Sequence, residues 1–163
     1  MKLKDLIEQY GDYDVQEGLM EFLEKPKPCN VWELEIEDEY YVITASGDIS
    51  LFAWLSESSE KEARSIGNVF LTREEAKFEV KRRQVYAIVK KYAHEFTEEE
   101  WENEKIFKFY PDFNYLKRVI GTGLSVSGKV PTLYFKSELD IRKAIDGVGE
   151  EDFIRYYLGV RNE

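Results

Sequence analysis

A glycine-rich segment comes closest to a known catalytic motif. Gly123 to Lys129 has two glycines separated by four residues and followed by lysine, which is the spacing of a phosphate-binding loop. Val130, however, stands where a serine or threonine must reach magnesium. Pro131 and a strand-like run follow where a helix N-terminus should hold phosphate. We therefore predict a hairpin turn here, with no affinity for ATP.

Metal and nucleophile chemistry lack the residues they need. The chain has one His and one Cys, too few for a zinc site with nitrogen and sulfur ligands. The acidic runs Asp12–Asp14 and Glu37–Glu39 lack the glycine and terminal glutamate of a calcium loop. Acid–base catalysis by two carboxylates stays open, since 33 acids always leave some pair close together. We expect no metal, no cofactor and no enzymatic activity.

The acidic charge is concentrated in one part of the chain. The net charge is −10, and the first 62 residues carry 16 acids against 5 lysines, a net of −11. Residues 63–163 carry 17 acids against 18 bases, a net of +1. An acidic surface can serve solubility alone. It can also fit a basic partner, such as a groove that normally holds DNA or RNA.

Acidic and apolar residues alternate from Trp32 to Glu37, which predicts a strand with an acidic outer face. Glu33, Glu35 and Glu37 would then form an even row, with neighbours about 6.6 Å apart. A groove lined with Lys and Arg would accept such a row in place of phosphates. The expected partner-binding residues are the following acids and neighbouring aromatics: Asp12, Tyr13, Asp14, Glu17, Trp32, Glu33, Glu35, Glu37, Asp38, Glu39 and Tyr40.

A basic stripe downstream offers an alternative. Its cations recur at helical spacing, and Glu79 with Arg83 forms an i,i+4 pair that partly neutralises it. Direct binding of nucleic acid is not expected, because such proteins favour a basic total charge. The alternative function is a nucleic-acid-binding module or a small-nucleotide sponge, which would use Lys77, Lys81, Arg82, Lys90 and Lys91.

One long helix is expected to organise the fold. Thr72 and Glu75 form a capping box, and no glycine or proline interrupts the sequence from Thr72 to Phe96. Apolar residues at spacings of three and four give that helix a face that needs cover. We predict an α+β fold in which a mostly antiparallel sheet packs on this helix, residues 72–96.

The remaining segments are shorter. A polar loop is expected over 56–65. The predicted strands are 40–44, 49–55, 106–110, 115–120, 124–126 and 132–135, with turns at 46–48, Pro111, Gly121, Gly123, Gly128 and Pro131. Thr97 is expected to cap a short acidic segment and Ser137 a helix, and the last helix to span 151–158.

The domain organisation follows from a proline-rich linker. Lys25 to Pro28 cannot continue a helix, so residues 1–28, with short helices at 3–9 and 16–24, are expected to form an extension to an α+β domain at 29–163. Phe70 and Phe135 each precede a hydroxyl cap by two residues. Either 29–96 and 105–158 are duplicated half-units, or any strand that leads into a capped helix looks like this. We predict that both phenylalanines are buried.

Several segments resemble a family of small acidic proteins in phages and prophages of Gram-positive bacteria. They are Trp32–Leu34 leading to Tyr40-Tyr41, the Ser46–Asp48 turn, and Gly67–Phe70 leading into Glu74–Ala76, while Lys4–Ile7 and Tyr10–Tyr13 resemble a module often attached to them. The resemblance implies a phage accessory protein in the cytoplasm of the bacterial host. It further implies an anti-defence inhibitor of the anti-CRISPR type, whose partner is a basic Cas effector or other nuclease. The chain has no apolar run long enough for a membrane span and no signal peptide.

Overall fold

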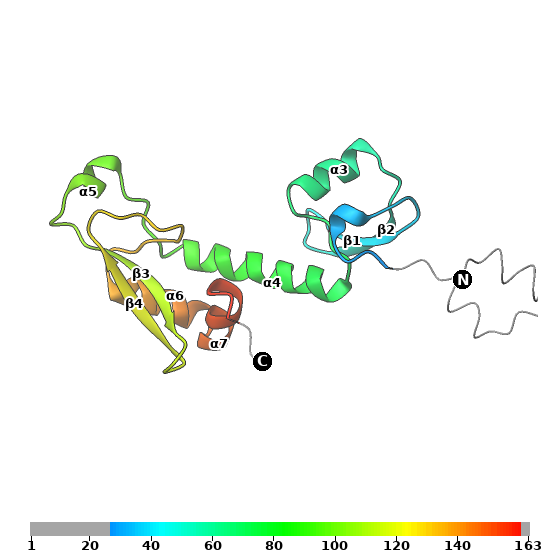
Figure 1. Cartoon of the computed structure of the whole chain (residues 1–163). Helices are drawn as coiled ribbons and strands as arrows, with labels where there is room; N and C mark the ends of the chain where they lie inside the picture. The colour runs from blue at the N-terminus through cyan, green and yellow to red at the C-terminus, as the bar shows by residue number, and fades with distance from the viewer. Residues whose placement is uncertain (1–26, 161–163) are drawn as a thin grey trace, which may run out of the picture. The chain divides into compact units, whose positions relative to one another are not determined.

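The computed structural model describes residues 27–160, which fall in two compact units with the boundary between Leu34 and Glu35 (Figure 1). Each unit is considered by itself. The described part of the first unit holds a short 3-10 helix, η1 (Val31–Glu33), which Asn30 caps by accepting a hydrogen bond from the Trp32 N–H. The predicted strand from Trp32 is therefore wrong. The expected helices at 3–9 and 16–24 lie outside the described residues.

The second unit opens with a hairpin. Strands β1 (Glu39–Ile43) and β2 (Ile49–Ala53) pair antiparallel, in register from Glu39 opposite Ala53 to Ile43 opposite Ile49. Gly47 has a φ of 89° in the connecting turn, a conformation that favours glycine. The two strands and the turn predicted at 46–48 are confirmed.

The polar segment that follows is a helix, α3 (Ser58–Ser65), where the sequence analysis expected a loop. Its start is stabilised by a capping box between Glu57 and Glu60. The helix forms although its apolar pattern is weak, because side-chain hydrogen bonds of the capping box satisfy N–H groups that the start of a helix leaves free.

Helix α4 (Arg73–Lys90) begins as predicted, with Thr72 and Glu75 in a capping box, but ends six residues before Phe96. The chain leaves the helix because the backbone N–H of His94 donates to the carbonyl of Tyr134, 2.8 Å away, instead of to a helical carbonyl. A tertiary hydrogen bond thus ends a segment whose sequence contains no helix breaker.

A second hairpin follows the short helix α5 (Glu98–Glu102), whose predicted cap Thr97 is confirmed. Strands β3 (Lys108–Asn114) and β4 (Val119–Ser125) pair over seven residues, and the chain turns at 115–118. Pro111, Gly121 and Gly123 lie inside these strands, so the turns predicted at them are wrong. Gly123 lies against the ring of Tyr110, where a Cβ atom would clash, so this glycine serves close packing.

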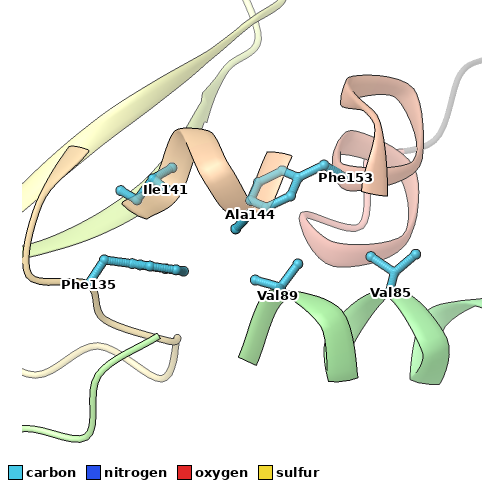
Figure 2. Close-up of a cluster of buried hydrophobic side chains, with 6 residues drawn as sticks. All are labelled: Val85, Val89, Phe135, Ile141, Ala144 and Phe153. Carbon is cyan, nitrogen blue, oxygen red and sulfur yellow. The ribbon is translucent and has the colours of Figure 1, made fainter. Parts of the chain in front are cut away.

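The main hydrophobic core lies between α4 and the C-terminal helices α6 (Glu138–Val148), α7 (Glu150–Asp152) and the π-helix η2 (Phe153–Tyr157). Ser137 caps α6, as predicted. Figure 2 shows side chains from three helices meeting Phe135 in this core. The buried residues are Val85, Val89, Phe135, Ile141, Ala144 and Phe153.

The two hairpins are followed by the same local arrangement. Phe70 exchanges two backbone hydrogen bonds with Tyr41 of β1, and Phe135 does so with Phe109 of β3. Each phenylalanine lies two residues before the cap of a helix. Phe135 is buried as predicted, whereas Phe70 is only half-buried, so that prediction is wrong in part. Division of the chain into duplicated half-units stays a prediction.

Helices combined with two small antiparallel sheets make an α+β fold, as predicted, although the strands form two separate two-stranded sheets. In Figure 1 the hairpin β1–β2 lies near one end of α4 and the hairpin β3–β4 near the other end. Among residues 27–160, no helix is long and apolar enough to cross a membrane.

Candidate functional site

The acid-rich segment before β1 forms a tight turn. The Asp38 N–H donates to the Glu35 carbonyl at 3.0 Å, and the Glu35 N–H donates to the Asp38 carboxylate at 2.7 Å. Glu37 has a φ of 75° in this turn, in the left-handed region that favours glycine. A glutamate is therefore held at a position where its backbone is strained and its side chain is exposed.

Two further hydrogen bonds attach this turn to the end of β2. The Glu37 N–H donates to the Trp54 carbonyl at 2.9 Å, and the Trp54 N–H donates to the Asp38 carbonyl at 2.8 Å. Two residues of the turn thus face one residue of the other strand, which is the arrangement of a β-bulge. The bulge fixes the exposed acids at the open end of the hairpin.

Large apolar side chains are exposed beside these acids. Ile36 is 65% exposed, Phe52 51% and Leu55 57%. Ile36 lies in the acidic turn, and Leu55 directly follows the Trp54 residue to which the turn is bonded. We call the exposed acids and apolar residues of this region the first-hairpin surface: Glu35, Ile36, Glu37, Glu39 and Leu55. Phe52 pairs with Tyr40 and lies on the face opposite to Glu39.

The buried carboxylate of Glu60 holds the backbone beside this surface in place. The carboxylate of Glu60 accepts hydrogen bonds from the Leu55 N–H at 3.0 Å, the Glu57 N–H at 2.7 Å and the Tyr40 hydroxyl at 3.1 Å. Burial alone would raise the pKa of Glu60, but the hydrogen bonds from the backbone of Glu57 and Leu55 outweigh it and lower that pKa. Burial, together with the Glu60 contact, raises the pKa of Tyr40 to about 12. The backbone of Leu55 is therefore held in place by an ionised carboxylate.

Tyr40 cannot act as the expected partner-binding anchor. Its side chain is only 4% exposed, and its ring packs edge-on against Trp54 at 5.5 Å. The side chains of Tyr40 and Trp54 lie on the same side of the sheet, and both are buried. Phe52, its cross-strand partner, is the aromatic side chain that stays accessible.

The even acidic row expected from Glu33 to Glu37 is absent. Glu33 belongs to η1 in the first unit, where its carboxylate accepts hydrogen bonds from the Cys29 N–H and the Asn30 amide. Glu35 and Glu37 lie in the turn of the second unit. Trp32 is exposed, as a binding residue must be. Four expected binding residues lie outside the described residues: Asp12, Tyr13, Asp14 and Glu17.

The basic stripe on α4 is largely neutralised. Glu79 accepts from both Arg82 at 2.6 Å and Arg83 at 2.9 Å, so the predicted Glu79–Arg83 pair is confirmed. Lys81 contacts Asp152 at 2.8 Å, and this hydrogen bond raises the pKa of Lys81. Lys77 pairs with Glu74 and Lys90 with Glu95, while Lys91 is exposed.

The Gly123–Lys129 segment is not the hairpin turn that we predicted. Its first half completes β4, and its second half is irregular. The Nζ atom of Lys129 lies over the ring of Trp101, 5.8 Å from its centre. The turn was predicted at glycines, whereas Gly123 packs against the ring of Tyr110 inside β4 and the turn lies at 115–118.

The exposed apolar residues of the first-hairpin surface were missed by the sequence analysis. A signal existed in Leu51 to Leu55, where five apolar residues follow one another. A strand of a hairpin with one covered face should alternate apolar and polar residues. The unbroken run therefore indicated apolar side chains without cover.

Among residues 27–160, no group of three or more His, Cys, Asp or Glu side chains is placed to hold a metal ion. Comparisons with models of known protein families, with curated proteins and with solved structures gave no match. The resemblance to small acidic phage proteins accordingly stays a prediction, and a function is inferred from the geometry of the surface.

Proposed function

We propose that this protein is a non-enzymatic binding protein that attaches to a basic surface of a partner protein through the first-hairpin surface. The observation that carries the proposal is the exposure of Ile36 and Leu55 beside acids that a hydrogen-bonded turn holds in place. Exposed apolar side chains that sit together and are rimmed by charge are typical of interaction sites.

The two kinds of side chain have different physical roles. Apolar side chains that become buried supply most of the affinity of an interface, and aromatic ones are common among its strongest contacts. Acids attract a basic partner over distance and disfavour acidic ones. The first-hairpin surface combines Ile36 and Leu55 as the apolar contacts with Glu35, Glu37 and Glu39 as the charged rim.

The strained backbone at Glu37 supports the same proposal. A residue other than glycine in the left-handed region costs on the order of 1 kcal/mol. Glycine would relieve this strain but would remove a carboxylate from the surface. The exposed Glu37 carboxylate is therefore assigned to the contact with the partner.

The acidic rim extends the proposal to the class of partner. Surfaces that bind nucleic acid carry lysine and arginine at phosphate spacing, and carboxylates compete for them. Together with the resemblance to phage accessory proteins, this favours inhibition of a nucleic-acid-acting defence system, such as a Cas effector or other nuclease. The alternative use of the α4 stripe for nucleic acid is less favoured, because most of its cations are engaged by Glu74, Glu79, Glu95 and Asp152.

Affinity capture from a bacterial lysate tests the proposal. The baits are the wild type, an Ile36→Ser/Leu55→Ser variant and, as a matched control, a Tyr115→Ser/Leu116→Ser variant that changes two exposed apolar residues elsewhere. We expect the wild type and the control to capture one basic nucleic-acid-binding protein that the first variant fails to retain. Equal recovery by all three baits would reject the first-hairpin surface, and duplex DNA that fails to compete would reject the nucleic-acid-mimicking part.

A further inference from the structure

Strand β4 has a free edge without the usual protection. It pairs with β3 over seven residues, and no other strand of residues 27–160 pairs with its second edge. The sequence of β4 (Val119–Ser125) contains no charged residue and no proline, and its register with β3 has no bulge. Natural edge strands usually carry one of these features, which prevent further pairing. The edge of β4 is therefore open to another strand.

The pairing of β3 shows which backbone groups of β4 point outward. Phe109 exchanges both backbone hydrogen bonds with Phe135, at 3.0 and 2.8 Å, so its N–H and carbonyl point away from β4. Because orientation alternates along an antiparallel strand, Pro111 points the same way. Its lack of an N–H then costs the ladder nothing. The β4 residues opposite Phe109, Pro111 and Phe113 are Leu124, Thr122 and Ile120. These three direct their own N–H and carbonyl groups to the free edge.

A pocket of about 340 Å³ lies between this strand and helix α6. Ile120 and Thr122 line it from β4, and Ile141 and Ile145 line it from α6. A strand added to the edge would place every second side chain on this side of the sheet, since side chains alternate between faces. The pocket could accept apolar side chains of an added strand.

The charged side chains that line the pocket determine which charge is favoured on a bound molecule. Glu138, Asp146 and Glu150 line the pocket together with one cation, Arg142. None of the four forms an ion pair within the described part of the chain. Three acids against one base favour cationic side chains on the occupant.

We propose that the groove between β4 and α6 binds an extended peptide segment of a partner protein, whose side chains on the pocket side include both apolar residues and lysine or arginine. The peptide adds to the edge of β4 as a further strand. Its backbone pairs with Ile120, Thr122 and Leu124, as in other recognition by strand addition. This site lies on the second hairpin and does not depend on the function proposed for the first.

The probe is a short synthetic peptide in which the residues on the pocket side, every second one, are in turn valine and lysine, and the residues between them are serine. The same peptide with glutamate in place of lysine is its control. Titration followed by amide NMR should show saturable binding of the lysine peptide, with the largest shifts at Ile120, Thr122 and Leu124. The Asp146→Asn/Glu150→Gln variant should bind it about three- to tenfold more weakly. Absence of binding, or equal binding of the glutamate peptide, would overturn the proposal.

Thr122→Pro tests the backbone contact, with Thr122→Ala as the control. Proline removes an outward N–H opposite Pro111 and leaves the β3 ladder intact, so we expect at least about fivefold weaker binding than for the alanine variant. If the proline variant does not fold, a peptide N-methylated at its edge-facing amides replaces it and should lose binding. Equal affinities would overturn strand addition. Sedimentation that shows only self-association of the chain through this edge, without peptide binding, would overturn the peptide as occupant.

Discussion

The two hairpins are followed by the same bridge and cap but differ in their buried charged residue. Beside the first hairpin the chain buries an acid, Glu60, which accepts hydrogen bonds from backbone N–H groups and from Tyr40. The second hairpin buries a base, Lys108, whose Nζ donates to the carbonyls of Asn103 and Val126 at 3.1 and 3.0 Å. Each fixes an irregular segment beside its hairpin. Similar backbone pairing thus supports surfaces of different chemistry in the two hairpins.

The halves also differ in where their phenylalanine is placed. Phe135 is fully buried in the main core, whereas Phe70 is half-buried at the edge of the first hairpin. Phe135→Ala should lower the free energy of unfolding by about 3–5 kcal/mol, and Phe70→Ala by roughly half as much. Urea denaturation measures both. Equal losses would contradict the placement of Phe135, and not Phe70, in the main core.

Substitution of the buried Lys108 should give the next largest loss of stability. Lys108→Met keeps a side chain of similar length but leaves backbone carbonyls without their donor, so we expect a loss of about 2–3 kcal/mol. Lys105→Met, at an exposed lysine in the same segment, is the matched control and should change little. If both variants unfold at the same urea concentration as the wild type, Lys108 does not hold these segments together.

The buried acid makes stability depend on pH. The pKa of Glu60 in the folded protein is below its ordinary value of 4.5, so its contribution is present above pH 4.5 and is lost as pH falls through the folded pKa. We expect the wild type to lose more stability below pH 4.5 than Glu60→Gln does. Urea denaturation at a series of pH values measures this. Parallel pH profiles of the two proteins would contradict the role of the ionised carboxylate, because Glu79, Glu100 and Asp140, whose pKa values are also lowered, are present in both.

Substitution in the strained turn should give the smallest change in the free energy of unfolding, and this change should be a gain. Glu37→Gly relieves a positive φ and should raise the free energy of unfolding by about 1 kcal/mol. Thermal denaturation measures the gain. The same variant should bind the captured partner more weakly. A more stable variant that binds as well as the wild type would show that the strain has no part in binding.

Local chemistry was predictable from the sequence where one side chain decides the structure. Thr72, Thr97 and Ser137 cap helices as expected, because a hydroxyl that accepts a backbone N–H needs only neighbours in sequence. Failures arose where distant groups decide. The end of α4 depends on the contact of His94 with Tyr134, and Gly123 of β4 on the ring of Tyr110.

The candidate site was only partly predictable for the same reason. Exposed acids at Glu35, Glu37 and Glu39 follow from charge and sequence position. The turn that holds them depends on Trp54, and burial of Tyr40 depends on Glu60, which lies twenty residues away in the sequence. Alternation predicted a strand here, whereas the positive φ of Glu37 and the bulge were not visible in the pattern.

Binding of the captured partner at two salt concentrations tests whether the acids of the first-hairpin surface attract that partner. One variant reverses three acids of the first-hairpin surface, Glu35, Glu37 and Glu39, to lysine. The control reverses three exposed acids of the second half, Glu99, Glu102 and Glu104, and so changes the net charge equally. At about 0.05 M salt the first variant should bind at least about tenfold more weakly than the wild type and the control about as tightly, and the difference should shrink at about 0.5 M salt. Equal losses for both variants, or no loss for either, would contradict a binding role for the first-hairpin surface.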